Sequence, residues 1–175
     1  MSEGSLSVRP VDFLDRPVSE LIVPEARVLV PAGAVRDWRV DPADLRALTT
    51  WGLPVVGQGN LVPDPRPGPH DARYEGEQAY RLGTEWGAVV GVVAGSGRVV
   101  RFGRTDPQPM PVNSTLAAFV ESAWRYLWLF RQEAGHYDDE TDDVLDAFLA
   151  RIQRLDPAVG DDPGTSYWPS VVEHW

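Results

Sequence analysis

The residues of this sequence that could do acid–base or metal chemistry are few and widely spaced. The three histidines, His70, His136 and His174, stand far apart in the chain, so none has a partner at the short spacing that zinc sites use. Cysteine is absent, which excludes disulfide bonds, thiolate metal ligands and a cysteine nucleophile. We therefore expect no metal site.

The familiar catalytic and cofactor motifs are also missing. Ser96 lies in "AGSGR", which is not the G-x-S-x-G pattern of a nucleophilic serine, and it suits a turn better. The chain has no lysine with which to build a Walker loop, and Gly57-Gln58-Gly59 leads into prolines instead of a helix. We expect no catalytic residue, no cofactor and no enzyme. A pocket with converging ionisable groups would favour the alternative, an enzyme built from scattered Asp, Glu and His.

The acidic run "YDDETDDVLD" (137–146) has the alternating acids of a calcium loop. However, the sixth position is Asp143 where glycine is needed, and the twelfth is Leu149 where a bidentate glutamate is needed. Solvated acids at a helix N-terminus are the first interpretation, and a docking patch for a basic protein is the second. That patch comprises Asp138, Asp139, Glu140, Asp142 and Asp143.

Negative charge is concentrated in the C-terminal part of the chain. The net charge is −10, and residues 105–175 hold 13 acids against 4 arginines, which gives −9. Acidic surface repels nucleic-acid backbones, so we expect no DNA or RNA partner. No apolar run is long enough for a membrane span, and no signal peptide is visible, which predicts a cytoplasmic protein.

The strongest helix pattern follows Asn113-Ser114-Thr115. Apolar residues then recur at spacings of three and four from Leu116 to Phe130, and Gly135 is the expected end. Any of the three polar residues can cap this helix. It is apolar around more than half its circumference, so we expect it to lie between a sheet and the next helix, predicted over 138–157.

Other segments predict the sheet and the remaining elements. Residues 86–103 form two valine-rich runs around Gly95-Ser96-Gly97, which indicates a hairpin. Helices are predicted within 41–54 and 166–175, and a short strand within 25–31. Proline-rich 57–76 is predicted to be a long exposed loop.

Four stretches together resemble the fourth family of the SUKH superfamily of bacterial immunity proteins. They are "LTTWGLP" (48–54), "YRLGTEWGAVVGVVAGSGRVVRF" (80–102), "VNSTLAAFVESAWRY" (112–126) and "LDPAVGDDPGTSYWPSVVEHW" (155–175). The third is the most specific, although Thr115 stands where the family usually has serine. The resemblance covers residues 40–175, whereas residues 1–40 correspond to a part in which the family is variable.

This resemblance implies an α+β fold, with a central mixed or antiparallel sheet and packed helices in one domain over 1–175. It also implies a non-catalytic antitoxin that binds and neutralises a cognate polymorphic toxin, such as a nuclease or deaminase. A regulatory or scaffolding module on the same fold is the alternative. The expected partner is a basic toxin protein, and the expected state is a monomer or weak homodimer. Candidate anchors are Trp38, whose polar neighbours favour exposure, and Tyr74.

Overall fold

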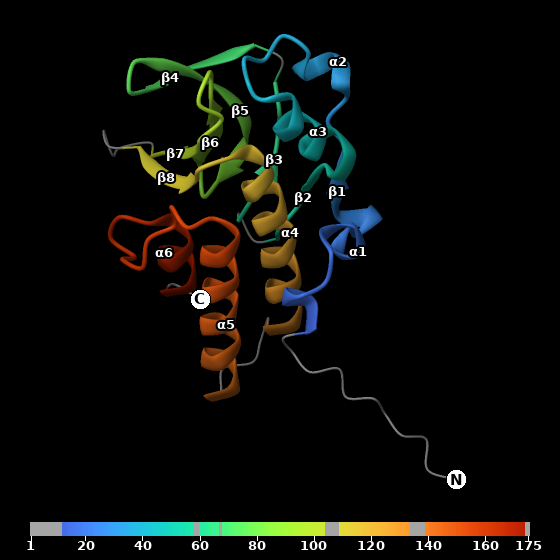
Figure 1. Ribbon diagram of the computed structural model, residues 1–175, viewed down its shortest axis with the longest axis vertical. Helices are drawn as coiled ribbons and strands as arrows, with labels where there is room; N and C mark the ends of the chain where they lie inside the picture. The colour runs from blue at the N-terminus through green and yellow to red at the C-terminus, as the bar shows by residue number, and fades with distance from the viewer. Residues whose placement is uncertain (1–11, 58–59, 67, 104–108, 134–138, 174–175) are drawn as a thin grey trace.

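The computed structural model describes residues 12–57, 60–66, 68–103, 109–133 and 139–173, and it shows a mixed α+β fold (Figure 1). The helices are α1 (Val18–Leu21), α2 (Ala32–Val35), α3 (Pro42–Trp51), α4 (Leu116–Glu133), α5 (Asp139–Leu155) and α6 (Tyr167–Glu173), with 3-10 turns at Asp12–Leu14 and Pro24–Ala26. The strands are β1 (Arg27–Val28), β2 (Leu53–Pro54), β3 (Val62–Pro63), β4 (Pro69–Tyr74), β5 (Glu77–Glu85), β6 (Ala88–Val93), β7 (Val99–Phe102) and β8 (Met110–Asn113).

The main sheet is antiparallel, with the strand order β3-β5-β6-β7-β8. β3 pairs with the end of β5 and β4 with its beginning, so both lie along the same edge of β5. β1 and β2 form a separate two-stranded sheet. The predicted valine-rich hairpin is confirmed as β6 and β7, with Gly95 and Gly97 at positive φ in its turn.

The expectation of one long loop over 57–76 is wrong in part. Its prolines do forbid an interior strand, yet β3 and β4 both form within it. Proline is tolerated at a sheet edge because its missing N–H can face away from the ladder. Both strands pair with β5 alone in the main sheet, so the prolines remove no hydrogen bond from a central strand.

α4 lies at the centre of the molecule, as its apolar circumference predicts. It packs against α3 and α5, and it contacts α1, β2 and β8 (Figure 1). Trp124 donates its indole N–H to the Gly52 carbonyl at 3.2 Å, which ties α4 to the end of α3. Gly52 has φ of 69°, and a Cβ there would stand 2.5 Å from the Val28 carbonyl oxygen, so only glycine fits.

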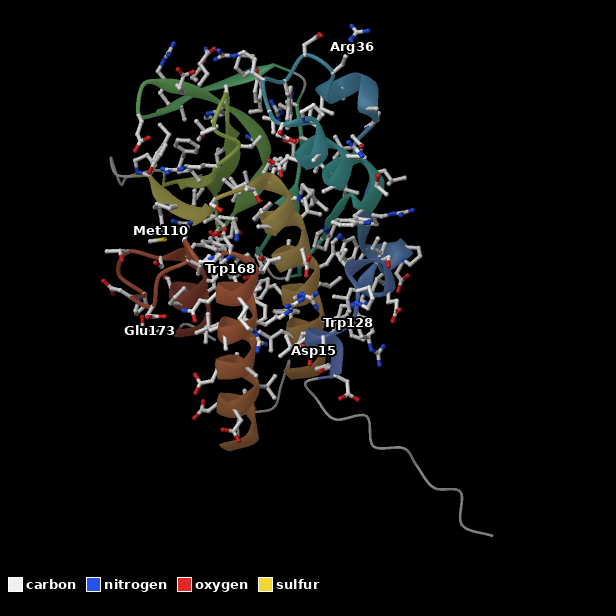
Figure 2. The ribbon with its side chains drawn as sticks, viewed as in Figure 1. Asp15, Arg36, Met110, Trp128, Trp168 and Glu173 are labelled. Atoms are coloured by element: carbon white, nitrogen blue, oxygen red, sulfur yellow. The ribbon has the colours of Figure 1, made fainter. Side chains whose placement is uncertain are left out.

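α4 also anchors the N-terminal segment through two side chains. Buried Arg125 donates to the carbonyls of Phe13, Leu14 and Arg16 at 2.8–3.1 Å. Trp128, on the side of α4 that faces this segment in Figure 2, donates to the Leu21 carbonyl at 2.8 Å. The buried charge of Arg125 is paired with Glu121 at 2.5 Å, and its bonds to these carbonyls use its remaining donors. The N-terminal segment is therefore part of the folded core.

Candidate partner-binding site

The three polar residues before α4, Asn113, Ser114 and Thr115, have different structural roles. Thr115 alone caps the helix, with its Oγ1 accepting from the Ala118 amide at 3.1 Å. A second acceptor comes from α3, where Asp44 takes the Ala117 amide at 2.9 Å. Together they satisfy two of the amides that a helix start leaves unpaired. Capping by Thr115 is therefore confirmed, and the tasks of Asn113 and Ser114 lie elsewhere.

Asn113 and Ser114 bind the carboxylate of Asp156, just past the end of α5. Oδ2 accepts from the Asn113 side chain at 3.0 Å and from the Ser114 amide at 2.6 Å. Oδ1 accepts from the Ser114 hydroxyl at 2.8 Å and from the Ala158 amide at 3.2 Å. Burial alone would raise the pKa of Asp156, but these hydrogen bonds outweigh it and hold the pKa below its ordinary value.

Trp168 completes this cluster from α6. Its indole N–H donates to the Asn113 side-chain oxygen at 3.0 Å, and Figure 2 shows it near the upper end of α5. Its ring meets Tyr126, Phe148 and Tyr167 edge-on, with centroids 4.9–5.8 Å apart. We call Asn113, Ser114, Asp156 and Trp168 the Asp156 cluster. It joins β8, α4, α5 and α6, which gives these residues of the quoted motifs a structural role.

Asp44 is a second buried carboxylate and behaves differently. Burial raises its pKa, and the hydrogen bond from Ala117 compensates only in part. A Cβ on Gly97, in the β6–β7 turn, would stand 3.1 Å from its Oδ2. Asp44 therefore links α3 to the start of α4 and lies close against the sheet.

The predicted anchor Trp38 is not exposed, so that expectation is wrong. Its exposed fraction is 4 %, and its ring stacks on Tyr80 with centroids 4.8 Å apart. The polar residues around it in sequence misled the prediction, because Arg36, Asp37 and Arg39 all point to solvent. Trp38 is a core residue.

Tyr74 is half-buried and lines a hollow of about 260 Å³ beside β7 and β8. Arg98, Pro111, Ser166 and Tyr167 contribute to the same wall. Burial raises the pKa of Tyr167 well above its ordinary value, so its hydroxyl is a neutral hydrogen-bonding group. The hollow offers one cation, two phenol rings and valine side chains, a mixture that suits a side chain of another protein.

Of the predicted acidic patch, Asp142 and Asp143 are exposed on α5. Asp138 and the side chains of Asp139 and Glu140 lie outside the described residues. The start of α5 lies at the opposite end of the molecule from β4, which carries Tyr74 (Figure 1). The structure therefore does not bring Tyr74 and these acids together.

A second hollow, of about 280 Å³, holds ionisable groups. It is lined by Arg66, His70, Asp71 and Arg81 among others. Asp64 engages both arginines, at 2.9 Å to Arg66 and 3.0 Å to Arg81. His70 Nδ1 accepts the Ala72 amide at 3.0 Å. These contacts fasten the segment between β3 and β4 onto β5.

Sequence reasoning missed Trp86, which stands in the tight turn between β5 and β6. It is 64 % exposed and has φ of 47°. The sequence did contain a signal for this turn, the dipeptide Trp-Gly between two strand patterns. Glycine at the second position of a two-residue hairpin turn indicates a turn type in which the first position also has positive φ.

The residue before Trp86 forms an ion pair that the sequence did not suggest. Buried Glu85 pairs with Arg101 at 2.5 Å and so joins β5 to β7.

The part of the chain that the structure describes contains no group of three or more His, Cys, Asp or Glu residues placed to hold a metal ion. Within those same residues, no helix is both long and apolar enough to span a membrane.

Comparison with known proteins gives one result. Residues 14–174 match the family model described as SUKH-4 immunity protein. No curated protein and no solved structure matches the chain. The match spans nearly the whole chain and includes the Asp156 cluster and both hairpins of β5. The chain therefore belongs to the SUKH-4 immunity protein family.

Proposed function

We propose that this protein is a non-catalytic antitoxin that binds a cognate polymorphic toxin, a basic nuclease or deaminase, and blocks its action in the cytoplasm of the producing cell. Residues 1–175 act as one immunity domain, as a monomer or weak homodimer. The observation that carries the proposal is the family match over residues 14–174.

The use of the motif residues supports this proposal. Asn113, Ser114 and Asp156 resemble the polar residues of an active site in type, yet they bind one another and Trp168 inside the fold. Residues committed to such a buried network stabilise a rigid scaffold. A rigid scaffold is what a stoichiometric inhibitor needs, because little ordering entropy is then lost on binding.

Charge supports the basic character of the partner. The protein carries −10 overall, and Asp142 and Asp143 are exposed on α5. Such a field attracts a positively charged protein over about a Debye length, roughly 8 Å at physiological salt, and raises the association rate. In this proposal Asp138, Asp139, Glu140, Asp142 and Asp143 guide the toxin, and Tyr74 contacts it.

Co-expression with the toxin domains encoded near this gene tests the proposal. One neighbouring toxin should kill cells alone and spare them when this protein is present. Neutralising Asp142 and Asp143 by Asn should lower the association rate several-fold at low salt and much less at high salt. Protection against none of the neighbouring toxins would contradict the proposal.

The hollow beside β5 provides the test against an enzyme. His70→Ala should leave protection unchanged, because His70 is used there to hold the Ala72 amide. Loss of protection by a folded His70→Ala protein that still binds the toxin would point to catalysis. Thermal unfolding and a binding titration of the same preparation distinguish these outcomes.

A further inference from the structure

Trp86 is in an unusual position for a large aromatic residue. It occupies the first central position of the two-residue turn between β5 and β6, with φ of 47°, and Gly87 follows with φ of 78°. Two successive positive φ values characterise a type I′ turn, whose first position favours Asn, Asp or Gly. A bulky side chain in this region is strained. The turn itself therefore does not explain the tryptophan.

The β4–β5 hairpin has the same turn without the aromatic residue. There Glu75 has φ of 51° and Gly76 has φ of 86°. Glu75 is exposed and charged, as a solvent-facing hairpin turn is expected to be. One strand, β5, thus carries two equivalent turns at its two ends, and only one of them presents a large apolar ring to solvent.

Trp86 does not stand alone on the surface. The exposed large hydrophobic residues of the described chain are Leu29, Val55, Val62 and Trp86. Val62 pairs with Thr84, two residues before Trp86. Val55 and Val62 flank the backbone bond from the Val56 amide to the Leu61 carbonyl, and they are 41 % and 43 % exposed.

The same register continues across the sheet. Thr84 pairs with Val89, and Val89 pairs with Phe102; all three are half-buried. The cross-strand neighbours Val62, Thr84, Val89 and Phe102, together with Val55 next to the Val56–Leu61 backbone bond, form what we call the apolar row. The row contains no charged side chain, so covering it with another protein desolvates no ion.

We propose that Trp86 is the anchor by which this protein holds its toxin, with its ring inserted into an apolar pocket of the toxin and Val55 and Val62 covering the adjoining surface. This inference rests on the proposed function. An exposed tryptophan close in register to smaller apolar residues has the composition of a binding hot spot. Backbone strain kept at an exposed site is common where a residue serves recognition instead of folding.

Charge decides what kind of protein fits. The chain carries −10 overall, mostly in residues 105–175, while the apolar row itself is uncharged. The complementary surface is therefore an apolar pocket within a protein that is basic as a whole. A second copy of this chain is disfavoured as the occupant, since two such copies repel each other. The acids then control how fast the toxin arrives, and Trp86 controls how slowly it leaves.

The test compares two matched substitutions, Trp86→Asn and Glu75→Asn. Both place Asn at the same position of the same turn type, where it is well tolerated. The probe is the toxin domain encoded beside this gene, inactivated by mutation and immobilised for binding kinetics. Trp86→Asn should weaken binding about 30-fold or more, mainly through faster dissociation. Glu75→Asn should change affinity less than about threefold.

The outcomes separate this inference from the proposed function. If the wild-type protein does not bind any neighbouring toxin domain, both are wrong. If it binds and Trp86→Asn binds within about threefold of wild type, the anchor is wrong and the antitoxin role stands. Sedimentation of the free protein completes the test. A dimer that Trp86→Asn dissociates would also overturn the inference, because the ring would then serve self-association.

Discussion

The Asp156 cluster and the β5–β6 turn are opposite kinds of site in one molecule. In the cluster, polar side chains are buried, and Asp156 accepts four hydrogen bonds from Asn113, Ser114 and Ala158. In the turn, an apolar ring is 64 % exposed on a strained backbone. The first arrangement stabilises the fold, and the second costs stability. The comparison shows that motif residues can build the scaffold, and in our proposal recognition depends on a residue outside the usual search for polar chemistry.

Removing the acceptor of the cluster should have the largest effect. Asp156→Ala leaves the donors of Asn113 and Ser114 buried without a partner, so the free energy of unfolding should fall by about 3 kcal/mol or more. Urea denaturation measures this loss. Asp142→Ala, which removes an exposed acid on α5, is the control and should change stability by less than about 0.5 kcal/mol. Equal losses in the two variants would contradict the role assigned to the cluster.

The charge of Asp156 should show in the pH dependence of stability. Its pKa in the folded state is lowered, so its contribution is complete above its ordinary value of 3.8 and is lost as pH falls through the folded value. Asp156→Asn keeps the shape but loses the charge. The wild type should exceed it by about 1–2 kcal/mol at neutral pH.

The difference in unfolding free energy between wild type and Asp156→Asn should shrink towards zero as the pH falls. Urea titrations at several pH values measure this difference. Asp44 works in the opposite sense: its pKa is raised, so its contribution is complete below 3.8 and is lost as pH rises through the folded value. Wild type and Asp156→Asn both keep Asp44, so the difference in stability between these two proteins reports on Asp156 alone. A pH-independent difference would show that the charge of Asp156 adds nothing.

A smaller loss should follow from removing the cap of α4. Thr115→Ala deletes the acceptor of the Ala118 amide, and we expect about 1 kcal/mol of destabilisation. Thr115→Ser, which keeps the hydroxyl, is the matched control and should recover most of the loss. Chemical denaturation of the three proteins decides the point, and a Ser variant as unstable as the Ala variant would exclude capping as the cause.

The smallest effect should have the opposite sign. Trp86→Asn relieves the strain of an aromatic residue at φ of 47°, so the free energy of unfolding should rise by about 0.5 kcal/mol. Thermal unfolding should show an unchanged or slightly higher midpoint, and Glu75→Asn gives the reference for the other hairpin. A clear loss of stability in Trp86→Asn alone would mean that the ring supports the fold.

The helices and the valine-rich hairpin could be predicted because their signals are local. The three-and-four spacing after Thr115 and the glycines around Ser96 each act within a few residues. The predicted end of α4 at Gly135 lies outside the described residues. The strands β3 and β4 were missed because edge pairing with β5 overrides the proline signal.

The candidate site was harder to predict because its contacts join distant parts of the chain. Asp156 and Ser114 are bonded although 42 residues separate them, and periodicity carries no information on such a contact. Trp38 was misjudged because neighbours in sequence do not report neighbours in space: its ring lies on Tyr80, from β5. Trp86 was missed because its exposure depends on the turn geometry and not on its residue type.

The most direct test of the account is a titration of toxin activity with this protein. We predict that, with both proteins far above the dissociation constant, activity falls in proportion to the protein added and reaches zero at one equivalent, as expected for stoichiometric binding. Complete loss of toxin activity at a small fraction of one equivalent would show turnover by an enzyme. No loss at a large excess would show that this chain does not neutralise the toxin.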